Sequence, residues 1–456
     1  MLQPYKLEKA DFSSLDQTSP IRDASTRILP NVIEAIYMVN EPAYLYWDKI
    51  KYSPRIPKNI PPVAFWQFVK EIRKYNSQKT AIKAESGNFY TWFHLNYTDE
   101  FLHKIDMQLG SSKLPVDIID PLDPEQKKKF LTKSIMEEAI ASSQLEGAIT
   151  TTNMAKKILS EKRKPTNESE RMIVNNYKTM QAINQEYKNK KLSIEVLFEL
   201  HKLITKDTLI NQDKEGRFRR DSDDITINDQ MNYIYYIPPK ADFVSLEIKR
   251  LILFANNEDN SGFIHPIIKA IFLHFWIAIL HPFYDGNGRL ARTIFYWYLL
   301  REGYWAMQYL PISLVIKEAP LQYGMAYVYS EQDDYDLTYF YDFHMRKLMQ
   351  ALKNFKDYLK RKIEESKMLE TSFYSKLNLN HRQIQSLRYL LSQGENAYIN
   401  PSSYEVLCGT SRTTAISDLK ILEKMNLVQS KKMGKYKRYY GTNELKKKVT
   451  KKNKLN

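Results

Sequence analysis

Residues 266–280, PIIKAIFLHFWIAIL, constrain the fold more than any other part of this 456-residue chain. The segment is apolar nearly all round, and such a helix belongs at the centre of a bundle rather than on a surface. The apolar stretch from Ala270 to Leu280 is too short to span a bilayer, and His274 interrupts it. We therefore expect a mainly α-helical protein built around this helix, with His274 as a core histidine that has a hydrogen-bond partner.

The segment that follows directly, HPFYDGNGRLAR at residues 281–292, predicts a site for an anion. Gly286, Asn287 and Gly288 end the buried helix in a tight turn, and a second helix, GRLARTIFYWYLL, begins at once. Glycines let the backbone approach a ligand closely, and a helix N-terminus offers unpaired N–H groups and the positive end of the helix dipole. This combination is best suited to phosphates.

Charged side chains surround the predicted anion site. Arg289 and Arg292 share a helix face, and two guanidinium groups suit a polyphosphate better than a lone carboxylate. Asp285 lies at the mouth, where Mg²⁺ bound to phosphate oxygens would need one carboxylate. His281 lies at the rim and carries an imidazole, the group best suited to removing a proton near neutral pH. The alternative is a helix–loop–helix whose polar loop simply faces solvent.

At every fixed position these residues match HPFx(D/E)GNGRxxR, the motif of the Fic family. The chain resembles this family from about Lys133 to Met349, which implies a Fic-type helical bundle. Most members with this form of the motif transfer AMP from ATP to a protein hydroxyl. The resemblance therefore implies ATP as the substrate, Mg²⁺ as the cofactor, and a target protein with an acceptor hydroxyl as the partner.

The resemblance also implies a role for each residue of the motif. His281 is the general base that deprotonates the target hydroxyl, and Asp285 holds Mg²⁺ between the α- and β-phosphates. The remaining roles are phosphate binding by the backbone of Gly286, Asn287 and Gly288 together with Arg289, contact with the γ-phosphate by Arg292, and core packing by Phe283. Arg289 in place of a lysine argues against the kinase-like branch of the family.

Two further segments fit the same resemblance. ITINDQMNYIYYIPP, residues 225–239, is rich in β-formers and predicts a hairpin around Asn228 and Asp229. It resembles the flap by which Fic enzymes align a target segment through strand addition, and the alternative is a plain surface hairpin. QYGMAYVYSEQDD, residues 322–334, lies where the family places adenine-pocket aromatics, which implies that Tyr323 contacts the base.

The predicted helix over residues 124–147 ends in SSQLEG, which contains Ser142 and Glu146. A carboxylate at a helix C-terminus is disfavoured by roughly 0.3–1 kcal/mol, so we expect either a cationic partner or a side chain that reaches into water. The spacing resembles the inhibitory motif of the Fic family, [S/T]xxxE[G/N]. It implies that Glu146 pairs with Arg292 and blocks the γ-phosphate, and that Ser142 supports the helix. Inhibition within one chain and inhibition across a homodimer both remain open.

Positive charge is concentrated at the C-terminus. Residues 371–456 carry 17 Lys or Arg against 5 Asp or Glu, which accounts for +12 of the net charge of +15. Residues 379–442 resemble a winged helix-turn-helix, with Gly409 in the turn and Ser411 as the cap of the second helix. In such domains the start of that helix meets base edges and the wing meets phosphates. The corresponding residues are Arg412, Thr413 and Thr414 in the helix, and Lys431, Lys432, Lys435, Lys437 and Arg438 in the wing. The alternative is a protein-docking or purely structural domain whose lysines are solvated.

The predicted organisation has five parts. Residues 1–110 form an N-terminal cover, 111–350 a Fic catalytic domain with the inhibitory helix at about 133–147, 351–378 a helical connector, 379–442 the winged helix, and 443–456 a disordered basic tail. The single cysteine excludes a disulfide framework, and the polar N-terminal sequence is not a secretory signal, so we expect a cytoplasmic protein.

The motif leaves two rivals to an autoinhibited adenylyltransferase. One is a Fic-fold transferase of another phosphate-containing group, or an enzyme that removes AMP. The other is a DNA-binding regulator whose core only senses nucleotide.

Overall fold

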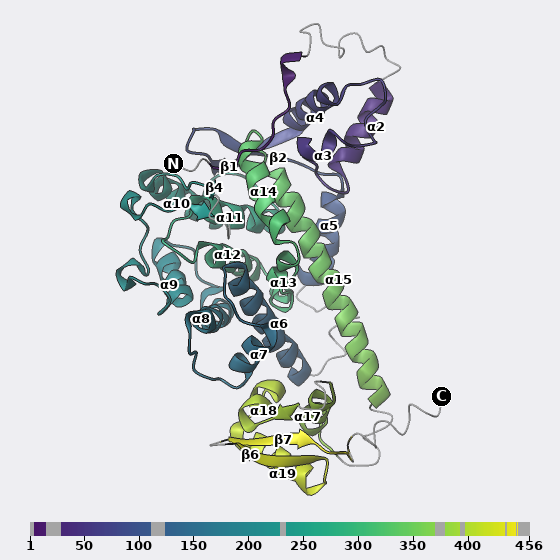
Figure 1. Ribbon diagram of the computed structural model, residues 1–456, viewed down its shortest axis with the longest axis vertical. Coiled ribbons are helices and arrows are strands. Elements are labelled where there is room, and N and C mark those ends of the chain that lie inside the picture. Colours follow the sequence, from purple (N-terminus) through teal and green to yellow (C-terminus); the bar gives the residue numbers. More distant parts are fainter. Residues whose placement is uncertain are drawn as a thin grey trace. The chain divides into compact units, whose positions relative to one another are not determined.

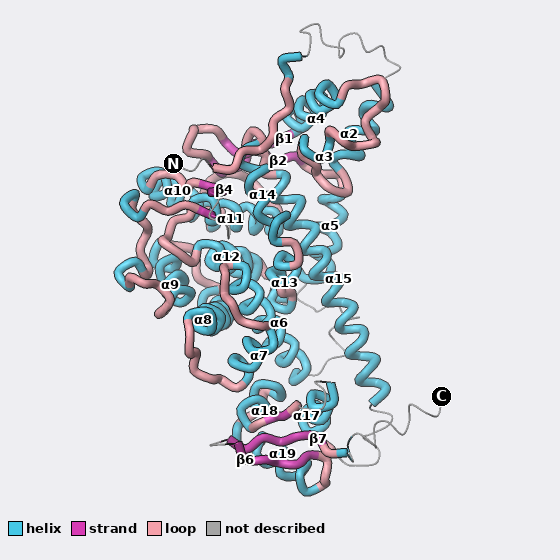
Figure 2. The backbone as a smooth tube through the Cα atoms, viewed as in Figure 1, coloured by secondary structure: helices cyan, strands magenta, loops and turns pink. Residues whose placement is uncertain are grey.

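The computed structural model describes residues 4–14, 29–110, 124–228, 234–369, 379–392, 397–433, 436–443 and 445. The chain is mainly helical, as predicted (Figures 1 and 2). It divides into two compact units, one of residues 1–110, 181–307 and 312–351, and one of residues 111–180, 308–311 and 352–456. No helix within these described stretches has both the length and the apolar character needed to cross a membrane.

The centre of the first unit is a pair of buried helices, α11 (Pro266–Leu280) and α12 (Asn287–Arg301). Nearly every side chain of both helices is buried, which confirms the expected place of the apolar segment. His265 caps α11 by accepting a hydrogen bond from the amide of Ile267, and proline at the first helical position has no N–H to leave unpaired. The ring of His274 lies 2.9 Å from the hydroxyl of Tyr323, so the predicted hydrogen-bond partner exists.

Further helices and two hairpins surround this pair in the first unit. The helices are α2 (Leu29–Asn40), α3 (Trp47–Ile50), α4 (Pro62–Asn76), α5 (Tyr97–Ile105), α9 (Ile194–Thr205), α10 (Ala241–Ala255), α13 (Ile312–Lys317), α14 (Pro320–Gln332) and the first part of α15 (Thr338–Leu369). Short 3-10 or π turns cover Phe12–Ser14, Asp106–Gly110, Ile183–Tyr187, Gln212–Lys214, Asp221–Asp223 and Trp305–Tyr309. The strands β1 (Ser77–Lys83) and β2 (Phe89–Phe93) pair antiparallel, as do β3 (Ile227–Asn228) and β4 (Ile234–Tyr236).

A buried charge fixes the N-terminal residues to the rest of the first unit. The guanidinium of Arg73 in α4 lies 3.6 Å from the centre of the Tyr44 ring and donates hydrogen bonds to Asn40 and to the hydroxyl of Tyr339 in α15. Arg73 is only 2% exposed, so these partners replace the water that the charge loses. The N-terminal residues therefore share one core with α15, whereas the predicted domain boundaries remain predictions.

The second unit contains α6 (Pro124–Leu145), α7 (Thr152–Ser160), most of α8 (Glu168–Ala182) and the end of α15. Its C-terminal part runs α17 (His381–Ser392), β5 (Tyr398–Ile399), α18 (Pro401–Cys408), α19 (Arg412–Lys424), β6 (Val428–Met433) and β7 (Tyr436–Gly441). The three strands form an antiparallel sheet in the order β5-β7-β6. Gly409 ends α18 in the left-handed conformation and Ser411 caps α19 by accepting a hydrogen bond from the amide of Thr414, both as expected.

Candidate active site

The loop between α11 and α12 carries the predicted motif, and its backbone is held by the motif's own side chains. Asn287 accepts a hydrogen bond from the Phe283 amide at 2.9 Å and donates one to the Phe283 carbonyl at 2.8 Å, which closes the loop. Phe283 is fully buried, so it is the core anchor that the motif implies. The side chain of Asn287 is therefore occupied in shaping the loop, and the Gly286 amide donates to the carboxylate of Asp285 at 2.5 Å.

Burial differs along the loop, so residues that a ligand can reach are distinguished from buried residues that hold the loop in place. His281 and Gly288 are half-buried and Asp285 is exposed. The carboxylate of Asp285, 49% exposed, lies 3.1 Å from the guanidinium of Arg289, which is itself fully buried. Arg289 also donates to the carbonyl of Ile204 in α9. Arg289 therefore orients Asp285 here, and its predicted contact with phosphate remains a prediction.

Mg²⁺ fits what the loop offers. This ion is commonly bound through one or two carboxylates together with substrate phosphates and water, rather than by a cage of protein ligands. Asp285 supplies one exposed carboxylate at the N-terminus of α12, and among the described residues no group of three or more acidic, His or Cys side chains could hold a metal. A metal here would therefore depend on the phosphates for most of its remaining ligands.

Arg292 lies one helical turn further into α12 and is 3% exposed. Its charge lowers the pKa of two buried histidines, His274 and His344, although burial is the larger cause for both. The pKa of His344 falls to about 3. The lowered pKa values keep both imidazoles neutral. Among these three side chains, Arg292 alone is therefore positively charged.

Sequence reasoning missed His201, a fully buried residue of α9. Its Nδ1 accepts a hydrogen bond from the Gly216 amide at 3.0 Å, so the proton must be on Nε2, which donates to the Asp285 carbonyl at 2.9 Å. The ring stacks on Phe283 with 3.9 Å between centres. Burial lowers the pKa of His201 to about 4, which keeps this tautomer neutral.

Sequence reasoning also missed Arg219, which lies just before the β3–β4 hairpin. Its side chain donates hydrogen bonds to the carbonyls of Leu280 and His281, and its backbone amide donates to Pro282. In the sequence, Arg219 is one of several basic residues in KEGRFRR, and nothing in that run distinguishes a buried arginine from a solvated one.

The remaining residues predicted for the nucleotide site and its inhibition fall in two places. Ser142 is buried in α6, and Glu146 is half-buried directly after it; both belong to the second unit, so pairing of Glu146 with Arg292 remains a prediction. The Tyr323 hydroxyl points at His274 and Tyr327, which places that side chain in the core cluster, and adenine contact remains a prediction.

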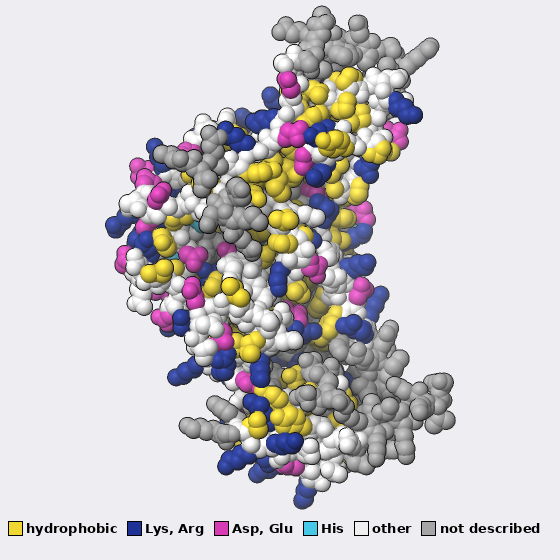
Figure 3. Space-filling view, viewed as in Figure 1, with side chains coloured by type: hydrophobic (Ala, Val, Ile, Leu, Met, Phe, Trp, Pro, Cys, Tyr) yellow, Lys and Arg dark blue, Asp and Glu magenta, His cyan; other side chains and the backbone are white. Residues whose placement is uncertain are grey.

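The C-terminal basic residues lie mostly at the surface. Arg412, Thr413, Lys431, Lys432 and Lys437 are exposed, Thr414 and Arg438 are half-buried, and Lys435 lies outside the described residues. Figure 3 shows Lys and Arg side chains gathered over these C-terminal elements. Lys437 also pairs with Glu423 at 3.1 Å, so part of its charge is compensated.

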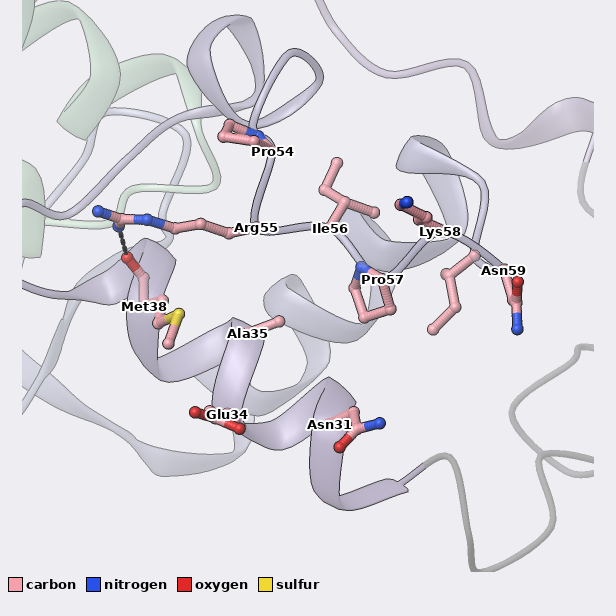
Figure 4. Close-up of a pocket in the computed structure, with 11 residues that line it drawn as sticks. Asn31, Glu34, Ala35, Met38, Pro54, Arg55, Ile56, Pro57, Lys58 and Asn59 are labelled. Atoms are coloured by element: carbon pink, nitrogen blue, oxygen red, sulfur yellow. Dashed lines mark hydrogen bonds between the residues drawn. The ribbon is translucent and has the colours of Figure 1, made fainter.

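A separate pocket lies in the N-terminal region, and none of the residues that line it is a predicted site residue (Figure 4). Its volume is about 480 Å³, and it is open to solvent between α2 and the turns that follow α3. The lining residues are Asn31, Glu34, Ala35, Met38, Pro54, Arg55, Ile56, Pro57, Lys58, Asn59 and Ile60. None of these is buried with an unmatched charge, so the pocket gives no sign of chemistry.

Replacing Gly286 by alanine is expected to destabilise the fold by about 1–3 kcal/mol. Gly286 has a φ of +81°, and a Cβ added there would lie 2.8 Å from Cγ2 of Thr205 in α9. Chemical denaturation measures the effect. Gly324→Ala is the matched control, because Gly324 lies within α14 with nothing within 4 Å, and alanine should stabilise that helix by about 0.5–1 kcal/mol. Equal stability of the two variants would contradict the close approach of α9 to the turn.

Stability is expected to fall as the pH is lowered from about 7.5 to about 5. His201 and His344 have lowered pKa values of about 4 and about 3 in the folded protein, both because of burial. In the unfolded chain these histidines have the ordinary pKa of about 6.5, so the unfolded chain takes up protons at a higher pH than the folded chain does. By about pH 5 this difference lowers the free energy of unfolding by about 2 kcal/mol for each histidine.

Urea denaturation at the two pH values measures this loss. His103→Gln is the control, since His103 is exposed on α5 and its removal should leave the dependence on pH unchanged. A free energy of unfolding that is the same at both pH values would mean that His201 and His344 are protonated in the folded protein.

The two buried helices and the loop that joins them lie in the part of the chain that resembles known proteins. Residues 191–299 match the model of the Fic/DOC family. The protein adenylyltransferase Fic of Drosophila melanogaster is 30% identical over 116 residues, which are 25% of this chain and 21% of that protein. The aligned part thus spans about a fifth of the curated relative.

Two solved structures match this chain with TM-scores below 0.5. A Fic family protein from Desulfovibrio desulfuricans G20 is 17% identical, with a TM-score of 0.46 over 75% of this chain and 95% of the other. A variant of Fic-1 from C. elegans is 16% identical, with a TM-score of 0.47 over 78% of this chain and 91% of the other.

Proposed function

We propose that this chain transfers AMP from ATP to a hydroxyl side chain of a target protein or of itself, and that Glu146 holds it back. The observation that carries the proposal is the loop between α11 and α12. It presents a half-buried imidazole, an exposed carboxylate and the N-terminus of a buried helix within one short segment. The match of residues 191–299 to the Fic/DOC family supports the same reading.

In the proposed reaction His281 accepts the proton of the target hydroxyl, and the hydroxyl oxygen attacks the α-phosphorus of ATP. The bond between that phosphorus and the bridging oxygen to the β-phosphate breaks, and pyrophosphate leaves in line. Backbone N–H groups at Gly286–Gly288 and the dipole of α12 stabilise the charge that develops on the phosphate oxygens. Asp285 would hold Mg²⁺, which supplies further neutralisation of that charge when bound.

The resemblance supports both the inhibition by Glu146 and the way in which a target protein would bind. Glu146, placed just after α6, would pair with Arg292 and deny the γ-phosphate its productive position, while Ser142 supports the helix from within. The β3–β4 hairpin would align the target segment by strand addition. Tyr323 would contact adenine, and inhibition would act either within one chain or across a homodimer.

Mass spectrometry after incubation with ATP and Mg²⁺ tests the reaction. Addition of one AMP to the chain or to an added protein supports the proposal, and the Glu146→Gly variant is the more sensitive form to use. Transfer of a different phosphate-containing group, or loss of AMP from a modified protein, would favour the other Fic-fold activities. Nucleotide binding without any covalent product would favour a nucleotide-sensing regulator.

A second candidate function, DNA binding by the C-terminal domain as a winged helix, rests on its exposed basic residues. Arg412 and Thr413 lie exposed at the start of α19, and Lys431 and Lys432 lie exposed on β6. A mobility-shift assay over a range of salt concentrations tests it, because each phosphate contact adds about 0.9 to the slope of log affinity against log salt.

The double variant Lys431→Ala, Lys432→Ala should lower that slope by about 2. Lys178→Ala, Lys188→Ala removes the same charge from exposed positions on other elements and is the matched control. Absence of binding at low salt would exclude DNA and leave a docking or structural role.

A further inference from the structure

We propose that Arg219 is a positioning residue that holds His281 in the geometry required for proton transfer. The inference rests on the proposed function. It assigns a role to a residue outside the loop, on the segment between α9 and the β3–β4 hairpin.

Arg219 binds the end of α11 more completely than any other side chain described near the motif. Its Nε donates to the His281 carbonyl at 2.7 Å, its Nη2 donates to the Leu280 carbonyl at 3.4 Å, and its backbone amide donates to the Pro282 carbonyl at 2.8 Å. These are three consecutive carbonyls at a helix C-terminus, where carbonyls have no partner within the helix. One residue therefore satisfies them all.

His281 needs this support because its backbone is strained. It ends α11 with φ 47° and ψ 57°, the left-handed region that residues with a Cβ adopt rarely. Such a conformation persists only where the surroundings hold it. Because the backbone angles of His281 set the direction in which its imidazole leaves the chain, loss of the Arg219 bonds would let the ring turn away from a bound hydroxyl.

The burial of Arg219 supports a role in holding the backbone at His281. The side chain is 7% exposed, and burial lowers the pKa of its guanidinium. A buried charge is costly unless its donors meet acceptors, and here the acceptors are backbone carbonyls on both sides. Nη2 also donates to the carbonyl of Pro239, which follows β4, so Arg219 joins the base to the chain leaving the hairpin.

The same short segment supports the other end of the loop. Gly216, three residues before Arg219, donates to His201, and His201 in turn donates to the carbonyl of Asp285. Residues 216–219 thus fix the backbone at His281 directly and at Asp285 through a neutral histidine. The two functional ends of the motif are held by one connection.

The test compares Arg219→Met and Arg219→Lys in a Glu146→Gly parent, with AMP transfer measured as kcat and KM for ATP. We expect Arg219→Met to lower kcat by about 10–100-fold while KM for ATP and the affinity for ADP change less than about threefold. Arg219→Lys should fall between this variant and the parent, because a lysine keeps the charge but cannot reach all the carbonyls. Arg220→Met is the matched control, since Arg220 is the exposed neighbour and should keep the kcat of the parent.

Each outcome decides between the alternatives. An unchanged kcat in Arg219→Met overturns the proposal, and so does an equal loss of kcat and nucleotide affinity, which would indicate a purely structural role. If Arg219→Met does not fold, Arg219→Lys decides alone by the same split between kcat and KM. A parent that transfers nothing while still binding ATP would instead overturn the proposed function.

Different contacts, all within the second unit, carry a second inference: we infer that the C-terminal domain sets the position of α6, the helix that ends just before Glu146. Helix α18 packs against α6 and α7. Val406 of α18 joins a cluster of buried side chains from these helices and α8, formed by Met136, Ile140, Ala155, Leu159 and Ile173. The C-terminal core uses other side chains, among them Tyr404, Cys408 and Leu419.

Polar contacts fix the direction of this packing. The Tyr398 hydroxyl donates to Glu161 at 2.6 Å, and Lys128 of α6 donates to the carbonyl of Gly409 at 3.4 Å. Each hydrogen bond adds only about 1 kcal/mol to stability, but together they define one orientation. A ligand that alters the C-terminal domain would therefore act on α6, to the extent that it binds one arrangement of this interface better than another.

Val406→Asp in the full chain tests this coupling, with Ile421→Asp on the exposed face of α19 as control. We expect Val406→Asp to raise AMP transfer about 5-fold or more when Glu146 is present and to have no effect in the Glu146→Gly variant. Tyr398→Phe should also raise AMP transfer, though less strongly. It serves as the test of the coupling if Val406→Asp unfolds at a lower temperature than the unaltered chain. Equal transfer by both variants and by the unaltered chain would overturn the inference, whereas inactivity of Glu146→Gly would overturn the proposed function.

Discussion

Replacing His281 by alanine is expected to lower AMP transfer about 10²–10⁴-fold in the Glu146→Gly parent. The loop leaves the imidazole half-buried at the end of α11, so it is the side chain of the motif best placed to take a proton from an incoming hydroxyl. Its loss removes general base catalysis and leaves the phosphate site intact. Initial rates with labelled ATP, measured at saturating target protein, give the change in kcat.

Nucleotide binding separates this role from a general loss of structure. Calorimetry with ADP should give the same affinity in His281→Ala as in the parent within about threefold, because backbone groups of α12 rather than the imidazole bind phosphate. His103→Ala, at an exposed histidine of α5, is the matched control and should keep full activity. Transfer by His281→Ala at the rate of the parent would show that another group takes the proton.

The elements that were predictable from sequence are those that local pattern specifies. An apolar segment followed by the GNG turn predicted the α11–α12 pair, and a Gly409 turn with a Ser411 cap predicted the α18–α19 corner. The prediction that Gly286–Gly288 end the buried helix was wrong, because α11 already ends at Leu280 with His281 in the left-handed conformation, and Asn287 and Gly288 belong to α12. His274 was expected to have a hydrogen-bond partner in the protein, because an imidazole buried within an apolar helix bundle has no water to bond with. Each of these expectations depends on neighbours within about one helical turn.

The supports of the loop could not be predicted, because they depend on contacts between distant segments. His201 lies 84 residues from the carbonyl of Asp285 that it binds, and Arg219 lies 62 residues from His281. The motif also gave no reason to expect that Arg289 is fully buried against α9. The pairing of a helix C-terminus with a particular arginine is a property of the packed fold, which one sequence does not specify.

Replacing Glu146 by glycine is expected to raise AMP transfer about 5–150-fold, the range of an ordinary coupling between two sites. The carboxylate follows the last turn of α6, where the helix dipole disfavours it, so its presence there costs stability unless a cation compensates. Pairing with Arg292 would supply that cation and would keep the γ-phosphate from the same guanidinium. Removal of the carboxylate frees Arg292 for the nucleotide, and the gain should appear both in the affinity for ATP and in kcat.

Two variants separate loss of charge from loss of helix. Glu146→Gln keeps the size of the side chain and should reproduce most of the gain, because the ion pair rather than the bulk of the residue opposes the phosphate. Glu186→Gly, at an exposed glutamate of the first unit, should leave transfer unchanged. If Glu146→Gly and Glu146→Gln both label at the level of the unaltered chain, then the carboxylate of Glu146 does not oppose the nucleotide, and the inhibitory role proposed for it is wrong.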